Sequence, residues 1–438
     1  MLPKLSVIGT GYLGATHAVC MAELGFDVIG VDVDEDKIKR LAAGEVPFYE
    51  PGLPELLTKH SGGGKLRFTT SYEEAAEFAD VHFICVGTPQ LPGQLAADVS
   101  QVEAAFHALA PHLTRKALVV GKSTVPTGTA VRMEALLAEL APCKDVELAW
   151  SPEFLREGFG VQDTLRPDRL VFGLHSAWAE QQLRVAFGPI IAAGTPVVVT
   201  DFATAELVKV SANSFLATKI SFINAMAEVC ETVGADVTAL AAAIGLDERI
   251  GKHFLRSGLG FGGGCLPKDI RAFMARAEEL GVAEALSFLR EVDEINRRRR
   301  VRAIDLGGEL LGGPYPGARI AVLGAAFKPD SDDIRDSPSL DVAATLGSQG
   351  ADVVIYDPKA MDNARRAHPE LGYAATLEEA LAGAELTMLL TEWREFVAMD
   401  PEAVGGLVAK RNIVDARNVL DAAAWRAAGW QLRALGRP

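Results

Sequence analysis

A glycine turn between an apolar run and a helical pattern constrains the fold more than any other feature of this sequence. The run Leu5–Ile8 has the composition of a buried strand and leads directly into Gly9-Thr-Gly-Tyr-Leu-Gly14. A helical pattern over residues 15–24 follows, and the next apolar run, Val28–Val31, ends at Asp32. Strand, glycine turn, helix and strand-terminal acid in this order predict a dinucleotide-binding βαβ unit.

The parts of this turn have separate tasks. Its glycines permit the sharp bend, the approach of a pyrophosphate and close packing of the helix, while the helix N-terminus receives the anion. Asp32 would accept hydrogen bonds from the adenosine ribose and repel a 2′-phosphate, so we expect NAD rather than NADP. The candidate cofactor contacts in the turn are Gly9, Gly11, Tyr12, Leu13 and Gly14.

Strand and helix patterns alternate through the first 200 residues. Apolar runs at residues 81–86, 117–120, 146–149 and 196–200 are typical of buried strands, and helical stretches separate several of them. This alternation predicts a doubly wound parallel sheet.

A long helical pattern follows this sheet. Asp201 provides an N-cap, and no glycine or proline interrupts the pattern before Gly234. A helix of this length indicates a connection between two domains or a dimer interface. Further helical patterns reach about residue 300 and end in the basic run at residues 297–300, for which we expect a solvated face at a helix C-terminus.

After breaks at Gly307-Gly308 and at residues 312–317, a second βαβ layout begins. It has strand patterns at residues 320–323 and 353–356, the second ending at Asp357, but it lacks a GxGxxG turn. A nucleotide-type fold that does not bind a dinucleotide is the natural interpretation.

We therefore predict an α/β chain of two Rossmann-like doubly wound domains joined by a long central helix. The expected regions are a NAD-binding domain at residues 1–200, a central helical and dimerisation region at 201–300, and a C-terminal α/β domain at 301–438.

Charge and cysteine content narrow the class of protein. A formal net charge of −15 over 438 residues argues against nucleic acid or an anionic membrane as the main partner. The first strand starts too early for a signal peptide, and no apolar run approaches the ~20 residues that span a bilayer. Five scattered cysteines indicate reduced thiols in the cytoplasm. Cys20, Cys85 and Cys230 lie in apolar patterns typical of packing, and Cys143 lies in a loop.

Cys265 departs from this pattern. It ends the run Gly258-Leu-Gly-Phe-Gly-Gly-Gly264 and precedes Leu-Pro-Lys268-Asp269. The glycines allow positive φ and close approach of a ligand. A lysine and a carboxylate so near a thiol are the parts of an activated nucleophile, because a nearby cation favours the thiolate. The alternative is a small buried residue in a tight loop.

Polar side chains follow three of the predicted strands. Val86-Gly-Thr88, the segment 122–129 and the segment 151–158 each begin at the sheet edge where such folds bind ligands. The last of them brings Glu153 and Glu157 to that edge.

The long helix carries a further polar group. Glu206, Lys209 and Asn213 share one face of it. A solvated stripe is the alternative, but the apolar neighbours of Lys209 leave little polar surface there.

Together these segments resemble the UDP-glucose/GDP-mannose dehydrogenase family. The resemblance covers nearly the whole chain, from the Gly9–Gly14 turn to Asp415-Ala-Arg417-Asn. Its specific motifs are Lys122-Ser-Thr-Val-Pro, Pro152-Glu-Phe-Leu-Arg-Glu-Gly, Gly260-Phe-Gly-Gly-Gly-Cys-Leu-Pro-Lys-Asp and Phe327-Lys328-Pro-Asp. The family oxidises a primary alcohol of a sugar nucleotide to a carboxylate with two NAD. The resemblance therefore implies oxidation of UDP-glucose to UDP-glucuronate.

The resemblance also implies catalytic roles. Cys265 would trap the aldehyde as a thiohemiacetal and then carry a thioester, which water hydrolyses. Lys209 and Asn213 would stabilise the developing alkoxide. Asp269 would act as a base or orient a catalytic water beside Lys209.

Further roles follow from the same resemblance. Glu153 would assist proton transfer during hydrolysis, and Thr124 would position a water. For NAD, the matching positions beyond the turn are Asp32, Lys37, Val86, Thr88, Thr124, Glu157, Lys268 and Arg335. For the UDP-sugar, which the C-terminal domain would bind, they are Phe154, Leu155, Glu157, Lys209, Asn213, Phe261, Gly262, Phe327, Lys328 and Arg417. Arg249 would reach the site of the partner in a homodimer, and no metal is expected.

Three alternatives remain open at the level of sequence. GDP-mannose or UDP-N-acetylmannosamine would keep the chemistry and change the sugar nucleotide, although Lys122-Ser-Thr-Val-Pro and Arg166-Pro-Asp-Arg169 favour the UDP-glucose branch. A two-electron β-hydroxyacid dehydrogenase shares the layout but has no nucleophilic cysteine. An NAD-binding redox sensor explains the glycine turn but not Lys209, Asn213 and Cys265 together.

Overall fold

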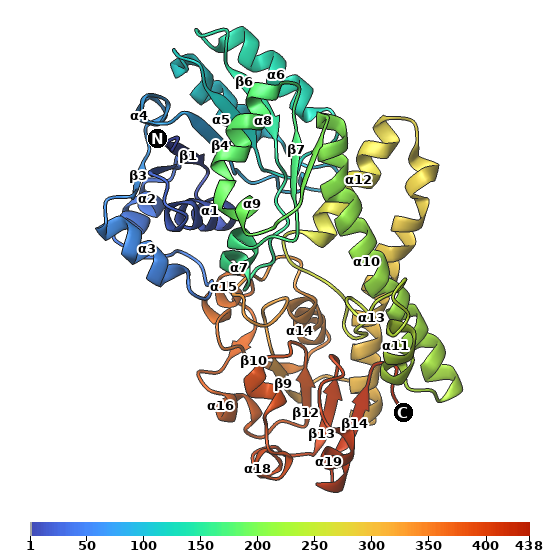
Figure 1. Cartoon of the computed structure of the whole chain (residues 1–438). Coiled ribbons are helices and arrows are strands. Elements are labelled where there is room, and N and C mark those ends of the chain that lie inside the picture. Colours follow the sequence, from blue (N-terminus) through green and yellow to red (C-terminus); the bar gives the residue numbers. More distant parts are fainter. Residues whose placement is uncertain (1) are drawn as a thin grey trace. The chain divides into compact units, whose positions relative to one another are not determined.

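The computed structural model describes residues 2–438, which form two compact units, each built around a mostly or wholly parallel sheet (Figure 1). The first unit extends to Ala212 and includes Arg271–Leu280, and the second comprises Asn213–Ile270 and Gly281–Pro438. The predicted fold class is confirmed: two Rossmann-like α/β parts and a long helix, α10 (Phe202–Val233), that contributes residues to both.

The first sheet has eight strands within the described residues, in the order β3-β2-β1-β4-β5-β6-β7-β8. This is the doubly wound order. β1 lies between β2 and β4, and the order in which successive strands are added to the sheet reverses there. The strands are β1 (Leu5–Ile8), β2 (Val28–Val31), β3 (Leu66–Thr69), β4 (Val81–Ile84), β5 (Leu118–Gly121), β6 (Glu147–Trp150), β7 (Leu170–Gly173) and β8 (Val197–Thr200). Its helices are α1 (Tyr12–Glu23), α2 (Glu35–Ala42), α3 (Leu53–Gly62), α4 (Tyr72–Phe78), α5 (Ser100–Leu109), η1 (Ala110–His112), α6 (Thr129–Leu140), α7 (Gly160–Leu165), α8 (Ala177–Ala186) and α9 (Gly188–Ala192).

Two expectations about this sheet are wrong. The sheet is not wholly parallel, because β7 runs antiparallel to β6 and meets it at the pair Trp150–Gly173. The valine run of β8 is not buried either, since Val198 and Val199 are 49% and 41% exposed. As the last strand of the sheet, β8 has a neighbour on one side only, so its apolar composition does not require burial.

The second sheet has six strands among the described residues, all parallel, in the order β11-β10-β9-β12-β13-β14. This repeats the layout of β3-β2-β1-β4-β5-β6, as the echo in the sequence predicts. The strands are β9 (Arg319–Leu323), β10 (Asp352–Tyr356), β11 (Gly372–Tyr373), β12 (Leu386–Leu389), β13 (Asn412–Asp415) and β14 (Gln431–Ala434). The helices of this unit are α11 (Val237–Gly245), η2 (Ala283–Leu286), α13 (Ser287–Leu311), α14 (Pro338–Ser348), α15 (Met361–Ala367), α16 (Leu377–Leu381), α17 (Arg394–Val397), α18 (Pro401–Gly405) and α19 (Ala422–Ala427), while α12 (Leu266–Glu279), like α10, has residues in both units.

The predicted cap of the long helix is confirmed. The Asp201 carboxylate accepts a hydrogen bond from the backbone N–H of Thr204 at 2.8 Å, which satisfies one of the unpaired donors at the start of α10. The helix runs for 32 residues to Val233, just before Gly234.

The predicted break at Gly307-Gly308 is wrong, because α13 continues through both glycines to Leu311. A Cβ on Gly307 would lie 2.7 Å from the Tyr315 hydroxyl and 2.9 Å from a Leu386 methyl. The glycine is there so that the helix can approach its neighbours, not to end the helix.

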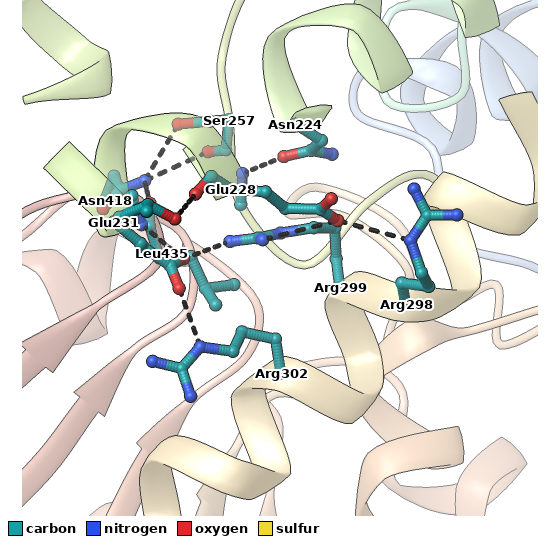
Figure 2. Close-up of polar contacts among 12 residues, drawn as sticks. Asn224, Glu228, Glu231, Ser257, Arg298, Arg299, Arg302, Asn418 and Leu435 are labelled. Atoms are coloured by element: carbon teal, nitrogen blue, oxygen red, sulfur yellow. Dashed lines mark hydrogen bonds and ion pairs between the residues drawn. The ribbon is translucent and has the colours of Figure 1, made fainter. Parts of the chain in front are cut away.

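The basic run is also not a solvated face at a helix end. Residues 297–300 lie in the middle of α13, and the Arg299 side chain is fully buried. Its guanidinium pairs with Glu231 of α10 at 2.8 Å, and Arg302 pairs with the other oxygen of the same carboxylate at 2.7 Å (Figure 2). A carboxylate from a segment distant in sequence turns one arginine of the run inward.

Candidate functional site

The glycine turn in the first unit has the geometry of a dinucleotide site. Gly9 has φ +87°, a conformation that only glycine adopts readily, and a Cβ on Gly14 would collide with the carbonyl oxygen of Gly9. Gly11 is the N-cap of α1, and among the described side chains none caps this helix start. Backbone N–H groups at an uncapped helix N-terminus suit a pyrophosphate, so this turn fits NAD.

The acid at the end of β2 is held in its charged form. Asp32 accepts hydrogen bonds from the Thr10 backbone N–H at 2.8 Å and from the Lys37 ammonium at 2.9 Å. Burial would raise the pKa of the Asp32 carboxyl, but the hydrogen bonds from Lys37 and from the backbone N–H groups of Asp34 and Thr10 hold that pKa below its ordinary value. Lys37, predicted by resemblance alone, therefore lies beside Asp32.

The loops after β4 and β5 are tied to each other beside the glycine turn. A Cβ on Gly9 would lie within 2.9 Å of the Val86 backbone, so the loop after β4 lies directly against the turn. The Thr88 hydroxyl donates to the Thr124 carbonyl at 2.8 Å, and the Ser123 hydroxyl donates to the Val86 carbonyl at 2.7 Å. The structure thus brings together the predicted residues Val86, Thr88 and Thr124.

The loop after β6 carries a buried charged pair. Glu153 accepts a hydrogen bond from the Lys209 ammonium of α10 at 3.0 Å and another from the Leu155 backbone N–H at 2.7 Å. Lys209 is almost fully buried and lies 5.6 Å from the Phe154 ring centroid, which the Arg169 guanidinium also covers at 3.7 Å. The predicted catalytic residues Glu153 and Lys209 therefore contact each other directly.

Glu206, which shares the helix face with Lys209, has a different task. Its carboxylate accepts hydrogen bonds from the backbone N–H groups of Gly128 and Ala130, both at 2.7 Å. It therefore caps α6 from outside and fixes the end of the segment 122–129. The face is buried, so the solvated-stripe alternative is wrong.

In the second unit, the chain itself fills the space that the glycine run leaves. Gly263 has φ +84°, and a Cβ there would lie 2.7 Å from the Phe327 ring. A Cβ on Gly264 would collide with the Arg335 guanidinium, and one on Gly262 would collide with the Asp336 carbonyl. The close approach expected of a ligand is made here by the chain's own side chains and backbone.

Cys265 lies at the start of α12. Its carbonyl accepts the first helical hydrogen bond, from the Asp269 backbone N–H at 3.0 Å, which makes Cys265 the N-cap residue. A helix N-terminus stabilises negative charge, and a thiolate there is favoured for the same reason. Cys265 is only partly buried, whereas burial raises the pKa of the Cys20 and Cys85 thiols to about 12. The packing role predicted for Cys20, Cys85 and Cys230 agrees with their burial.

Asp269 stands one turn after Cys265 and is buried. One carboxylate oxygen accepts from the Asn213 side-chain amide at 2.7 Å, and the other accepts from the Lys268 ammonium at 2.6 Å. Three residues of the predicted site, from two different helices, thus form one hydrogen-bonded group.

The remaining candidates of the second unit have varied surroundings. Phe261 is buried, and its backbone N–H and carbonyl both bond to the Asn296 side chain, at 2.8 and 2.9 Å. Arg417 is buried and donates to the carbonyls of Leu390 and Gly260, at 2.6 and 3.0 Å. Lys328 lies 5.5 Å from the Phe327 ring centroid.

Two arginines lie at the surface. Arg335 binds Asp333 through its guanidinium at 2.7 Å, and the side chain is largely exposed. Arg249 is 88% exposed and pairs with Asp247 of the same turn at 2.6 Å. An exposed arginine on a short turn can reach another molecule, which is the role that the resemblance implies for Arg249.

The second sheet has an acid at the position that Asp32 holds in the first. Asp357, at the end of β10, accepts hydrogen bonds from the backbone N–H groups of Ala325 and Ala326 and from the Trp393 indole, at 2.7, 3.0 and 3.0 Å. These bonds fasten the turn after β9 to the end of β10.

Comparison with known proteins finds matches to one family along most of this chain. Three domain profiles of the UDP-glucose/GDP-mannose dehydrogenase family match it: the NAD binding domain at residues 3–191, the central domain at 203–298 and the UDP binding domain at 321–422. The chain belongs to the UDP-glucose/GDP-mannose dehydrogenase family.

Relatives within this family match along their whole lengths. A UDP-glucose 6-dehydrogenase of Rhizobium meliloti is 40% identical, over 99% of this chain and 100% of its own. The UDP-glucose 6-dehydrogenase YwqF of Bacillus subtilis is 39% identical over 99% of this chain and 98% of its own. The solved structure of a UDP-glucose dehydrogenase from Pyrobaculum islandicum superposes with a TM-score of 0.92 at 37% identity, covering 100% of this chain and 98% of that one.

A more distant structure belongs to a different substrate class. The UDP-D-ManNAc dehydrogenase of Pyrococcus horikoshii has a TM-score of 0.87 at 28% identity, over 99% of both chains. None of the helices formed by residues 2–438 combines the length and apolar character needed to cross a bilayer.

Proposed function

We propose that this chain catalyses the NAD-dependent four-electron oxidation of UDP-glucose to UDP-glucuronate. The single observation that carries the proposal is the placement of Cys265 as the N-cap of α12, one turn before the buried Asp269. Full-length identity of about 40% to UDP-glucose 6-dehydrogenases supports the choice of substrate.

The proposed chemistry passes through two covalent states of Cys265. Its thiolate adds to the aldehyde carbon and forms a thiohemiacetal, whose oxidation gives a thioester. Water then attacks the thioester carbonyl, the C–S bond breaks, and the thiolate and the carboxylate are released. The glycine turn and Asp32 would hold NAD, which would supply the hydride acceptor for both oxidations, of the alcohol to the aldehyde and of the thiohemiacetal to the thioester.

The buried polar residues are assigned to proton transfer and to stabilisation of the developing negative charge. Asp269, fixed by Asn213 and Lys268, acts as a base or orients the catalytic water. Lys209 and Asn213 donate to the developing alkoxide. Glu153, which accepts from Lys209 at 3.0 Å, assists proton transfer during hydrolysis.

Binding roles complete the proposal. Beyond the turn and Asp32, the proposed NAD contacts are Lys37, Val86, Thr88, Thr124, Glu157, Lys268 and Arg335. The proposed UDP-sugar contacts are Phe154, Leu155, Glu157, Lys209, Asn213, Phe261, Gly262, Phe327, Lys328 and Arg417. We also propose that residues 1–200, 201–300 and 301–438 act as the NAD-binding, dimerisation and UDP-sugar-binding regions, and that the enzyme works in the cytoplasm.

We further propose a homodimer built on α10. Phe215, Phe222, Val229 and Val233 are exposed and recur along one side of this helix, as in a helix that packs against another. In Phe222→Glu, light scattering after size exclusion should give the monomer mass, because a charge cannot be buried in an apolar helix contact. Val301→Glu, at a somewhat more exposed apolar position on α13, is the matched control and should leave the mass unchanged. Arg249, exposed on its turn, would then contribute to the partner's site.

The decisive experiment is an NADH-release assay with a panel of UDP- and GDP-sugars. UDP-glucose should give the highest kcat/KM, with two NADH formed for each UDP-glucuronate. One NADH per substrate with a free aldehyde or ketone would instead support a two-electron dehydrogenase. Faster turnover of UDP-N-acetylmannosamine, the sugar-nucleotide class of the Pyrococcus horikoshii structure, would move this chain to that branch.

A further inference from the structure

A buried carboxylate outside every motif considered above lies between two parts of the NAD-binding unit. Glu50, in the loop before α3, is only 2% exposed. Its side chain reaches the N-terminus of α1 on one side and the N-terminus of α7 on the other. It lies 108 positions before Gly158, one of its partners, so no local pattern points to it.

Three donors converge on this carboxylate. The Tyr12 hydroxyl donates to one oxygen, and the Gly158 backbone N–H donates to the same oxygen at 2.7 Å. The Val161 backbone N–H donates to the other oxygen at 3.3 Å. The Gly158 N–H also lies 3.1 Å from the Tyr12 hydroxyl oxygen, so the group is closed on itself.

The neighbouring glycine makes this arrangement possible. A Cβ on Gly160 would lie 2.8 Å from the Tyr12 hydroxyl and 3.4 Å from the Glu50 carboxyl carbon. The site accepts no further atoms there. Burial and the hydrogen bond to Glu50 both raise the pKa of Tyr12, so its hydroxyl remains a donor at all working pH values.

The partners of Glu50 belong to the cofactor turn and to the loop of Glu153. Tyr12 stands between Gly11 and Leu13, whose backbone forms the proposed anion site. Gly158 directly follows Glu157 and ends the loop in which Glu153 accepts from Lys209. A single carboxylate therefore fixes the end of that loop relative to the cofactor turn.

A carboxylate has a chemical advantage at this point. All three partners donate, and an ionised carboxylate offers acceptors only. An amide in its place would set its own N–H₂ against one of the donors, and a buried unpaired donor is costly.

We propose that Glu50 is a positioning residue that couples the cofactor turn, through Tyr12, to the loop carrying Glu153 and Glu157. The coupling orders the anion site before NAD arrives and holds Glu157 at a fixed distance from it. The assignment of Glu153 and Glu157 rests on the proposed function, whereas the coupling to NAD binding does not depend on the identity of the sugar.

The test measures NAD affinity by calorimetry on the full chain without any sugar nucleotide. Glu50→Gln should raise the Kd for NAD roughly 5- to 30-fold, which corresponds to about 1–2 kcal/mol and is of the order of one hydrogen bond. Amide exchange of residues 158–161, followed by mass spectrometry without NAD, should accelerate in the same variant. Because both readouts omit the substrate, failure of the UDP-glucose assignment would leave them unchanged.

Glu23→Gln is the matched control. Glu23 also joins the first helix to the segment after Glu50, by accepting from Lys59 of α3 at 2.7 Å, but it touches neither the turn nor the Glu153 loop. It should lower the Tm without changing the Kd for NAD or the exchange of residues 158–161.

A lower Tm in Glu50→Gln, with a Kd within twofold of wild type and unchanged exchange, would reduce Glu50 to a helix cap and overturn the proposal. If Glu50→Gln does not fold, Tyr12→Phe decides instead. It removes only one hydroxyl from the cluster, and the proposal requires the same direction of change in Kd and in exchange.

Discussion

Replacing Arg299 by alanine should lower the stability of the second unit far more than the same change at its neighbour Arg298. The two arginines are adjacent in one helix and identical in chemistry. They differ in burial, since the Arg299 side chain is 0% exposed and the Arg298 side chain is 47% exposed. The comparison therefore isolates the effect of burial on an ion pair.

The expected magnitudes follow from the partners. Arg299 pairs with Glu231 at 2.8 Å, and removing one member of a buried pair costs about 3–5 kcal/mol. Arg298 pairs with Glu291 at 3.0 Å at the surface, where such pairs contribute about 0–1 kcal/mol. Glu231 keeps Arg302 and the Gly436 backbone N–H in the variant, so the loss should lie at the lower end of the buried range.

Native-state amide exchange suits this measurement, because a chain of two units does not unfold in a single two-state step. Peptides of α13 and β14 report the opening free energy of the second unit. We expect a fall of about 3 kcal/mol for Arg299→Ala and less than 1 kcal/mol for Arg298→Ala. Equal effects of the two changes would refute the reasoning, because burial would then not decide the contribution of the pair.

Three further outcomes follow from the structure. Cys265→Ser should fold and bind NAD but lose steady turnover by several orders of magnitude, because alkoxide is a poorer leaving group than thiolate. Cys85→Ser should instead cost about 1–3 kcal/mol of stability with a modest change in rate. Near-normal turnover of Cys265→Ser would exclude covalent catalysis. Burial and the nearby Arg115 lower the pKa of His82 to about 3 from 6.5, so below pH 6.5 the unfolded state binds one proton more than the folded state. The stability of the first unit should therefore decrease by about 1.4 kcal/mol for each unit by which the pH falls. The opening free energy of β4, measured by native-state amide exchange between pH 4 and 6, should depend less on pH by that amount in His82→Gln, and an unchanged dependence would contradict the reasoning. Gly263→Ala should lower the Tm by more than Gly264→Ala, because Gly263 has a positive φ and faces the Phe327 ring, whereas a methyl group on Gly264 has only the end of the flexible Arg335 side chain to displace. Equal Tm values would contradict this explanation of the glycine run.

Features that depend on neighbours in sequence were predictable. The first βαβ unit has the predicted strands at Leu5–Ile8 and Val28–Val31, because glycine conformation and apolar runs act locally. The N-cap at Asp201 has the same local character. In the second sheet the strand patterns at residues 320–323 and 353–356 correspond to β9 and β10, whereas β11, β12, β13 and β14 were not predicted individually.

Features that depend on distant partners were not predictable. Arg299 pairs with Glu231, which lies 68 positions earlier in the sequence, and no residue near the basic run indicates such a partner. Gly307 looks like a helix breaker until Tyr315 and Leu386 are seen against it. The exposure of Val198 follows from the position of β8 at the end of the sheet, which composition does not report.

The candidate site divides in the same way. Glycine turn, strand-terminal acid and Cys265 were identifiable because each is a local motif. Glu50 and Glu206 hold the loops of the site in place by accepting hydrogen bonds from backbone N–H groups. Glu50 lies outside the motifs that carry the chemistry, and in the sequence Glu206 is indistinguishable from a residue of a solvated polar stripe. Residues that act by holding backbone have no sequence signature of their own.

The polar contacts drawn in Figure 2 join segments that the ribosome makes at different times. Asn418 donates to Ser257, just before the glycine run, and the Gly436 backbone N–H donates to Glu231. At about 5–20 residues per second, the ribosome makes these partners roughly ten to thirty seconds after Cys265. A nascent chain that stops before Asn418 therefore contains the whole proposed catalytic set, yet it lacks the contact from Asn418 to the loop that leads to the thiol.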